Sequence, residues 1–273
     1  MSRCRQPPCE KSSGATGPSL TVDYVTPEIS VVIPLLDEER NVEPLHAELT
    51  SVLRRLAVAY EIIMVDDGSS DRTFERLADV QAKDPSVRIV RFQRTYGQTA
   101  AFAAGFARAR GRIIVTSDGD LQNDPNDIPR MLTLAQTHDI VVGWRRVRQD
   151  SFFTRHVPSV VANWLIGLIT GVRLHDNGCS LKVFRAEVVK PLKLRPGMHR
   201  YLPAIASQLG PRVAEIEVRH RPRRHGRSKY GLSRTFRVVA DLVTLRRLMR
   251  EAVEGEVSQT PLYEIREVRE VTA

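Results

Sequence analysis

The sequence predicts an α/β fold with a mostly parallel sheet and helices on both faces. Short apolar runs that suit buried strands alternate with stretches in which apolar residues recur at helical spacing. Strands that alternate in this way with helices are typical of parallel sheets. Acidic residues directly follow two of the apolar runs, which places polar groups at strand ends.

The elements follow one another in a regular order. Ile29–Pro34 predicts a buried first strand, and apolar residues from Val42 to Leu56 predict the first helix. Further strands are expected at 62–65, 87–92, 112–116 and 139–142, with helices after Ser70, over 100–109 and near 128–135. Two later strands are expected at 181–184 and 213–218.

Composition indicates a globular protein with an anionic partner. The chain has 273 residues, of which 42% are hydrophobic and 27% charged, enough for a full core. Its net charge of +9 favours nucleic acid, acidic lipid or a phosphorylated substrate. The three cysteines, Cys4, Cys9 and Cys179, provide neither a disulfide framework nor a tetrahedral metal set, which indicates a reducing compartment.

Four regions are expected along the chain: a flexible leader at 1–27, a main domain at 28–231, an amphipathic helix at 232–250 and a loose charged tail at 251–273. The apolar segment Val157–Val172 is too short for a membrane span of about 20 residues, so we predict no transmembrane helix. This segment and the basic amphipathic helix could lie on a membrane surface. They could equally pack on the core or on a partner subunit.

Two acidic motifs follow predicted strands. Asp118 and Asp120 lie two residues apart, and their carboxylates, with the amide oxygen of Gln122, suit Mg²⁺ or Mn²⁺. Asp66 and Asp67 end another strand. Ligands of open parallel sheets bind outside the carboxyl ends of the strands, so both motifs predict a metal-assisted nucleotide site. Each motif alone would also make an ordinary turn.

Seven motifs in order carry a resemblance to a known family. They lie at 32–39, 65–71, 96–98, 118–123, 148–153, 176–182 and 223–230. Over about Ile29 to Leu245 the chain resembles family 2 glycosyltransferases of the GT-A fold, a Rossmann-like fold. Within that family it is most similar to the transferases that move a sugar onto a polyprenyl phosphate, either dolichyl or undecaprenyl phosphate.

The resemblance implies a donor site for a nucleotide sugar. Pro34, Leu36 and Glu38 would border the nucleoside, where the family usually has an aromatic residue in place of Leu36. It also implies that Asp66 lies near the base, that Asp67 points toward the sugar and metal, and that Gln98 contacts the donor. Asp118 and Asp120 would be catalytic and, with Gln122, would hold the metal. The choice between UDP and GDP stays open.

The resemblance also implies an acceptor site. Five residues would bind the lipid phosphate, whose oxygens suit guanidinium groups: Arg145, Arg155, Ser159, Arg223 and Lys229. Each arginine could instead be a solvated surface charge. Asp176 is the third catalytic candidate and would orient the acceptor, or it could simply cap the loop before Asn177. His175, His199 and His220 fit no metal-cluster spacing.

The implied function is metal-dependent, inverting transfer of a sugar from a UDP- or GDP-sugar to polyprenyl phosphate. We expect a peripheral protein at the cytoplasmic face of a membrane, as a homo-oligomer or with a separate anchoring subunit. Transfer to a soluble or protein acceptor is the alternative. Nucleic acid is not expected as a partner, because the basic stretches lack the interleaved aromatic residues that stack on bases.

Overall fold

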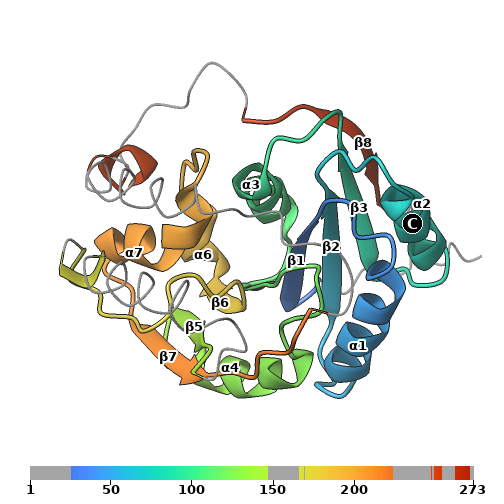
Figure 1. The fold of residues 1–273 in the computed structure, drawn as a ribbon. Helices are drawn as coiled ribbons and strands as arrows, with labels where there is room; N and C mark the ends of the chain where they lie inside the picture. Colours follow the sequence, from blue (N-terminus) through green and yellow to red (C-terminus); the bar gives the residue numbers. More distant parts are fainter. Residues whose placement is uncertain are drawn as a thin grey trace, which may run out of the picture.

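The computed structural model describes residues 26–146, 166–168, 170–223, 247, 249–253 and 262–270. These residues contain an eight-stranded sheet with the strand order β7-β5-β6-β4-β1-β2-β3-β8. The first half of the chain alternates strands with helices (Figure 1). Its elements are β1 (Ile29–Leu35), α1 (Val42–Arg54), β2 (Tyr60–Asp66), α2 (Thr73–Gln81), β3 (Val87–Phe92), α3 (Gln98–Arg108), β4 (Ile113–Thr116), η1 (Pro125–Asp127), α4 (Ile128–Leu134) and β5 (Ile140–Trp144).

The second half is less regular. It contains β6 (Lys182–Arg185), α6 (Ala186–Val189), η3 (Met198–Tyr201), α7 (Leu202–Ala206), η4 (Ser207–Leu209), β7 (Val213–Glu217) and β8 (Ile265–Arg269). Strands β1 to β4 are parallel, as are β5 and β7, whereas β6 runs antiparallel between β4 and β5. The prediction of a mostly parallel sheet is confirmed.

Helices cover both faces of the sheet, as predicted. One core cluster packs α1, α2 and α4 against one face, and the other packs α3, α6 and α7 against the opposite face. Along β1 the buried residues alternate between them, so that Val31 and Ile33 belong to the first cluster and Val32 to the second. Helix α3 lies very close to β1, because a Cβ atom at Gly105 would be 2.2 Å from Cγ1 of Val32.

The last described segment differs from the expectation. Residues 251–273 were expected to be loose, but Ile265–Arg269 forms β8, which pairs antiparallel with β3. The pairing covers an edge that β3 would otherwise expose. The ring of Tyr263 stacks on Phe92 with centroids 5.0 Å apart, and Gln81 Nε2 donates to the carbonyl of Arg269 at 2.9 Å. The expectation of a loose tail is therefore wrong for this segment.

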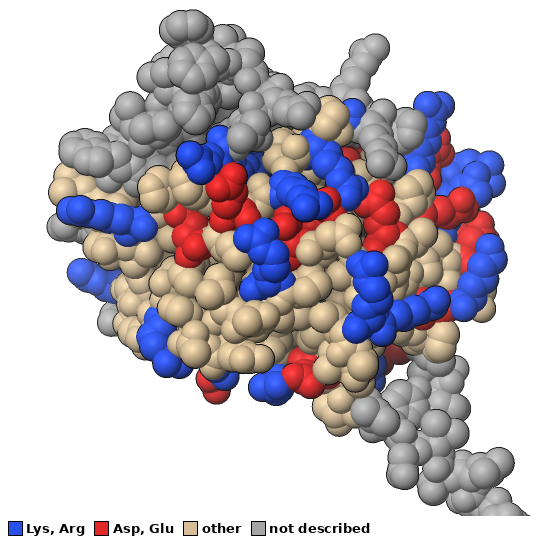
Figure 2. Space-filling model, turned by 90° about the horizontal axis from the view of Figure 1, so that it is seen from below, with Lys and Arg blue, Asp and Glu red and all other residues tan. Residues whose placement is uncertain are grey.

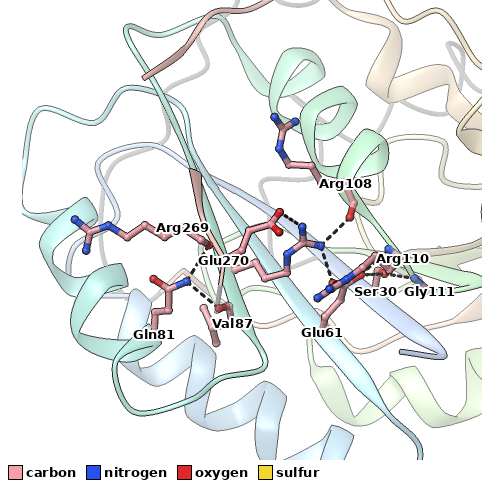
Figure 3. A network of polar contacts seen from close by, with 10 residues as sticks. Ser30, Glu61, Gln81, Val87, Arg108, Arg110, Gly111, Arg269 and Glu270 are labelled. Carbon is pink, nitrogen blue, oxygen red and sulfur yellow. Dashed lines mark hydrogen bonds and ion pairs between the residues drawn. The ribbon is translucent and has the colours of Figure 1, made fainter. Parts of the chain in front are cut away.

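A buried polar network lies at the amino ends of the parallel strands (Figure 3). The Glu61 carboxylate accepts hydrogen bonds from Ser30 Oγ at 2.6 Å and from Arg88 Nη1 at 2.8 Å. The backbone N–H of Arg110 donates to it at 2.6 Å. Arg88 also pairs with Glu270, just beyond β8. The network therefore ties β1, β2 and β3 to the end of the chain.

Several expectations fall largely or wholly outside the described residues. They are the leader at 1–27, most of the helix at 232–250, and the acceptor residues Arg155, Ser159 and Lys229. No helix among the described residues has both the length and the apolar character needed to cross a membrane.

Candidate active site

The loops after β1 and β2 are bound to each other at the carboxyl ends of the strands. Asp37 Oδ1 accepts from the backbone N–H of Ser70 at 2.8 Å, and the N–H of Asp37 donates to Ser69 Oγ at 3.0 Å. The N–H of Glu38 donates to Thr73 Oγ1 at 2.8 Å. Asp37 has a positive φ of 49°, a conformation that Asp tolerates better than most residues. The short side chains of Ser69, Ser70 and Asp37 therefore fix this rim.

The predicted nucleoside-binding residues lie on the same rim. Pro34 is half-buried within β1, and Leu36 and Glu38 are half-buried in the loop that follows. The carboxylate of Glu38 accepts from Asn41 Nδ2 at 2.5 Å. The pairing of β1 with β2 and the hydrogen bond from Glu38 to Thr73 thus hold this segment next to Asp66 and Asp67.

Asp66 is fully buried at the end of β2. Its Oδ1 accepts from the N–H of Ser69 at 2.9 Å, whereas Oδ2 has no hydrogen-bond partner among the described residues. Arg91 Nε lies 3.5 Å from Oδ2. Burial raises the pKa of Asp66 above its ordinary value, against the opposing effects of Ser69 and Arg91. A buried carboxylate oxygen of this kind is suited to accept a hydrogen bond from a ligand.

Asp67 holds the loop that leads into α3. Its Oδ1 accepts from the N–H of Tyr96 at 2.7 Å, and its Oδ2 from the N–H of Gly97 at 2.9 Å. The neighbouring Gly68 has φ +72°, and a Cβ atom there would lie 2.4 Å from the carbonyl carbon of Arg94. The two loops touch through their backbones, and Asp67 binds this backbone in addition to any role toward the sugar.

Asp118 and Asp120 lie in the loop after β4 and bring three predicted roles together. Gln98 Nε2, predicted to contact the donor, donates to Asp118 Oδ1 at 2.6 Å. Arg223, predicted to bind the acceptor, donates to Asp120 Oδ2 at 2.6 Å. Residues far apart in the sequence therefore meet at this acidic pair.

The acidic pair is electrostatically strained. Burial and the charge of Asp118 raise the pKa of Asp120 to about 6, despite the opposing charge of Arg223. Leu121 between the pair and Gln122 has a positive φ of 62°. The backbone N–H of Gln122 donates to Asp120 at 3.2 Å, and its side-chain amide donates to the carbonyl of Arg221 at 3.3 Å.

This donor set fits a divalent cation. A cation would relieve the repulsion between two neighbouring carboxylates, and Mg²⁺ and Mn²⁺ commonly take one or two protein carboxylates while substrate phosphates supply other ligands. The described residues contain no group of three or more His, Cys, Asp or Glu side chains placed to hold a metal. The pair would therefore need oxygen ligands from the substrate or from water.

Asp176 and Arg145 form one ion pair, although the sequence predicted separate roles for them. The guanidinium donates through Nε at 2.7 Å and Nη2 at 3.0 Å to the two carboxylate oxygens, and Asp176 is 1% exposed. The N–H of Asp176 donates to Glu215 at 3.0 Å. Burial opposes the charged form of Arg145, but the hydrogen bonds and charge of Asp176 outweigh it and raise the pKa of Arg145, with a smaller contribution from Asp118.

Sequence reasoning missed several polar residues around the site. Lys182 is buried in β6 and donates to the carbonyl of Cys179, and burial lowers its pKa. Thr99 Oγ1 bonds to His199 Nδ1 at 2.7 Å and accepts from the N–H of Gly197 at 3.0 Å. A lysine within an apolar strand pattern was a signal that could have been read. Thr99 offered none.

The outer surface carries mixed charge. Acidic side chains form a band that is interleaved with basic ones across the face seen in Figure 2. The net charge of +9 is therefore not displayed as a uniform basic patch on the described part of this face.

The sheet order, the helices on both faces and the acidic loops at the strand ends define a GT-A type of glycosyltransferase. Residues 30–192 match the Glycosyl transferase family 2 model, and the chain belongs to that family. The fold agrees with solved structures. Glucosyl-3-phosphoglycerate synthase from Mycobacterium tuberculosis, in complex with Mn²⁺ and UDP-glucose, aligns with a TM-score of 0.63 and 22% identity over 81% of this chain and 79% of that one.

The sequence relatives are more similar. Dodecaprenyl-phosphate galacturonate synthase from Rhizobium johnstonii is 47% identical over 228 residues, which span 82% of this chain and 68% of the relative. Undecaprenyl-phosphate 4-deoxy-4-formamido-L-arabinose transferase from Aeromonas hydrophila is 39% identical over 218 residues, 79% of this chain and 67% of the relative. The predicted resemblance to polyprenyl-phosphate sugar transferases is thus confirmed.

Proposed function

We propose that this glycosyltransferase moves a sugar from a nucleotide sugar to a polyprenyl phosphate with the help of a divalent cation. The observation that carries the proposal is the acidic pair Asp118–Asp120, which contacts Gln98 on one side and Arg223 on the other. The residues proposed to bind the donor, the cation and the acceptor therefore lie next to one another. The names of the relatives, at 47% and 39% identity, support a polyprenyl phosphate as the acceptor.

The donor nucleoside would lie on the rim formed by Pro34, Leu36 and Glu38. Asp66 supports this placement, because its buried Oδ2 can accept from the ring N–H that both uracil and guanine present. Leu36 would contribute apolar contact with the base, although a leucine cannot stack as an aromatic ring does. These contacts favour a nucleotide without deciding between UDP and GDP.

The cation would be held by Asp118 and Asp120, with Gln122 beside them. When bound, Mg²⁺ or Mn²⁺ supplies positive charge to the diphosphate that leaves. Asp67 and Gln98 contribute by holding the start of α3 against the acidic pair. Gln98 thereby fixes the position of the Asp118 carboxylate, and Asp67 fixes the backbone that precedes Gln98.

The acceptor phosphate would meet Arg223 and Arg145, with Arg155, Ser159 and Lys229 contributing from outside the described residues. A phosphate monoester is ionised at pH 7, so its oxygen can attack the anomeric carbon without a strong general base. Attack opposite the departing diphosphate inverts the configuration at that carbon. Asp176 would act by holding Arg145 through the two hydrogen bonds described above.

We also propose that the protein works at the membrane surface, as a peripheral protein on the cytoplasmic face. Within the apolar segment 157–172, the described Leu168 has a side chain that is 68% exposed, which suits contact with lipid. Sedimentation with vesicles of anionic lipid should recover the protein, and recovery should fall with added salt if basic residues contribute. Complete absence from the vesicle pellet would contradict this part of the proposal. Attachment as a homo-oligomer or through a separate anchoring subunit is the alternative to direct binding.

Incubation with Mn²⁺, undecaprenyl phosphate and a panel of UDP- and GDP-sugars tests the reaction. We expect a glycosylated lipid phosphate and one nucleoside diphosphate per transfer. Removing one of the two cation ligands should cost at least about a hundredfold in kcat/KM, so Asp118→Asn should be nearly inactive. Asp139→Asn is the matched control, because Asp139 precedes β5 at the opposite end of the sheet and pairs with Arg212.

Each part of the proposal has a result that would contradict it. Transfer only to a soluble acceptor would contradict the lipid acceptor. Full activity of Asp118→Asn would contradict the assignment of the cation site. A product with retained anomeric configuration would contradict direct attack by the phosphate.

A further inference from the structure

We infer that the C-terminal segment 262–270, which includes β8, positions the two acids at the donor rim, Asp66 and Asp67. The inference deepens the proposed function and rests on it, because it assigns a role to residues outside the donor site itself. Two separate sets of contacts connect this segment to the two acids. One set lies on the α2 face of the sheet and the other on the α3 face.

The first connection reaches Asp66 through Arg91. Arg91 Nε lies 3.5 Å from Asp66, and its guanidinium lies 4.0 Å from the ring centroid of Phe74 in α2. The guanidinium of Arg269 lies 4.9 Å from the same ring. Glu267 stands opposite Arg91 in the strand register and pairs with Arg269 at 2.5 Å. Two guanidinium groups thus lie over the Phe74 ring, and the one from Arg269, which Glu267 also binds, limits where Arg91 can lie.

The second connection reaches Asp67 through aromatic rings. Tyr263 stacks on Phe92 at 5.0 Å, and Phe92 meets Tyr96 edge-on at 5.7 Å and 88°. The backbone N–H of Tyr96 donates to Asp67 at 2.7 Å. The N–H of Gln93 also donates to the carbonyl of Glu264 at 3.2 Å, which fixes the entry to β8 beside these rings.

A local irregularity in the pairing turns Ile265 toward the α3 face. The register between β3 and β8 shifts between Arg91 and Phe92. A bulge of this kind changes the side of the sheet to which the following residues point. Arg269 and Glu267 therefore contact the α2 side, whereas Ile265 and Tyr263 pack with the α3 side.

The same segment has a second anchor that does not lead to the donor rim. Glu270 pairs with Arg88 and, through it, with Glu61 at the amino ends of the strands (Figure 3). This anchor holds the strand end at the edge of the sheet remote from Asp66 and Asp67. Its removal should lower stability by breaking the pair with Arg88 while the contacts of Arg269 and Tyr263 stay in place, which makes it a matched control.

Hydrogen exchange at individual amides tests the inference without a substrate. The N–H of Ser69 reports on Asp66, and those of Tyr96 and Gly97 report on Asp67, because they donate to these carboxylates. We expect Arg269→Gln to speed exchange at Ser69 and Tyr263→Leu to speed exchange at Tyr96 and Gly97. Arg269→Lys, which keeps the cation, should restore much of the protection at Ser69, and Glu270→Gln should leave all three amides unchanged while lowering Tm.

Binding of UDP and GDP in the presence of Mn²⁺ gives the functional readout. We expect Arg269→Gln and Tyr263→Leu each to weaken nucleotide binding by about fivefold or more, the lower end of ordinary coupling between distant sites. Unchanged exchange in both variants, or the same pattern in Glu270→Gln, would overturn the inference. Failure of the unmodified protein to bind either nucleotide would instead contradict the proposed function, and the exchange rates would still decide whether β8 holds the two acids.

Discussion

The charged groups around Asp120 show how the negative charge of the site is neutralised. It is buried, it lies beside Asp118, and it forms an ion pair with Arg223. Arg223 is also one of the two described residues that we propose for the acceptor phosphate, the other being Arg145. The guanidinium of Arg223 therefore neutralises the charge of Asp120 before ligands bind. Once a metal ion neutralises that charge instead, the guanidinium is available to bind a phosphate.

The raised pKa of Asp120 predicts how stability and metal binding change with pH. Its pKa rises from 3.8 to about 6, so the folded protein holds this proton more tightly than the unfolded chain. Without metal, this contribution to stability is present below the unfolded pKa and is lost as pH rises toward about 6. A divalent cation binds the carboxylate form. The increase in Tm caused by Mn²⁺ over EDTA should therefore be small at pH 5 and larger at pH 7.

The control for this prediction is Asp120→Asn, which cannot titrate. In that variant the effect of Mn²⁺ on Tm should be small and nearly independent of pH. An equally large Mn²⁺ effect at pH 5 and pH 7 in the unmodified protein would contradict the prediction.

At the scale of single elements, the loop after β2 depends on one glycine. Gly68 combines φ +72° with a Cβ position 2.4 Å from the backbone of Arg94, so Gly68→Ala must both strain the backbone and push two loops apart. Strain in such a backbone region costs of order 1–3 kcal/mol, and the collision adds to it. We expect a lower urea midpoint and weaker nucleotide binding, because Asp67 lies between the same loops.

Gly210→Ala separates these two effects. Gly210 has a similar φ of +74°, but a Cβ atom there would have nothing within 4 Å. This variant should therefore be destabilised only by backbone strain, and its nucleotide affinity should be unchanged. Equal losses of stability in the two variants would show that the contact with Arg94 matters little.

Some elements could be read from the sequence and others could not. Strands β1 to β5 were predicted because both faces of these strands are covered and their sequences are almost entirely apolar. β8 was missed because three of the five residues of Ile265–Arg269 are charged, as is common in an edge strand, and a charged segment also resembles a loose tail. The antiparallel direction of β6 leaves no mark in its own composition.

The candidate site, too, could be predicted only in part from the sequence. Strand ends predicted where Asp66, Asp67, Asp118 and Asp120 would gather, since parallel strands share one carboxyl edge. The sequence could not predict which side chains form ion pairs with one another in the site. The pairing of Arg145 with Asp176, or of Arg223 with Asp120, depends on how separate loops approach one another.

At the scale of the whole molecule, the buried network of Glu61 is the main polar junction away from the site. Burial alone would raise the pKa of Glu61, but hydrogen bonds from Ser30, Arg110 and Arg88 outweigh it and lower the pKa. Removing one partner of a buried charged pair costs about 3–5 kcal/mol, because the other charge is left uncompensated. Glu61→Gln should therefore lose stability of this order in urea unfolding.

The KM values of Glu61→Gln for donor and acceptor should stay near those of the unmodified protein, measured well below its unfolding midpoint. A large rise in either KM would contradict the view that this network serves stability alone. Arg112→Gln is a suitable control, because Arg112 and its partner Glu28 are exposed and such surface pairs contribute about 0–1 kcal/mol.

The reversed direction of β6 has a consequence for how related enzymes can diverge. Lys182 at the beginning of β6 lies opposite Thr116 at the end of β4. The polypeptide just before β6 therefore lies at the carboxyl ends of the parallel strands, where we propose that the nucleotide binds. Asp176 and the turn that follows it are delivered there by a different stretch of chain from the one that builds the rim of β1 and β2. Under the roles proposed above, mutations in that stretch would change the acceptor site and leave the donor site intact.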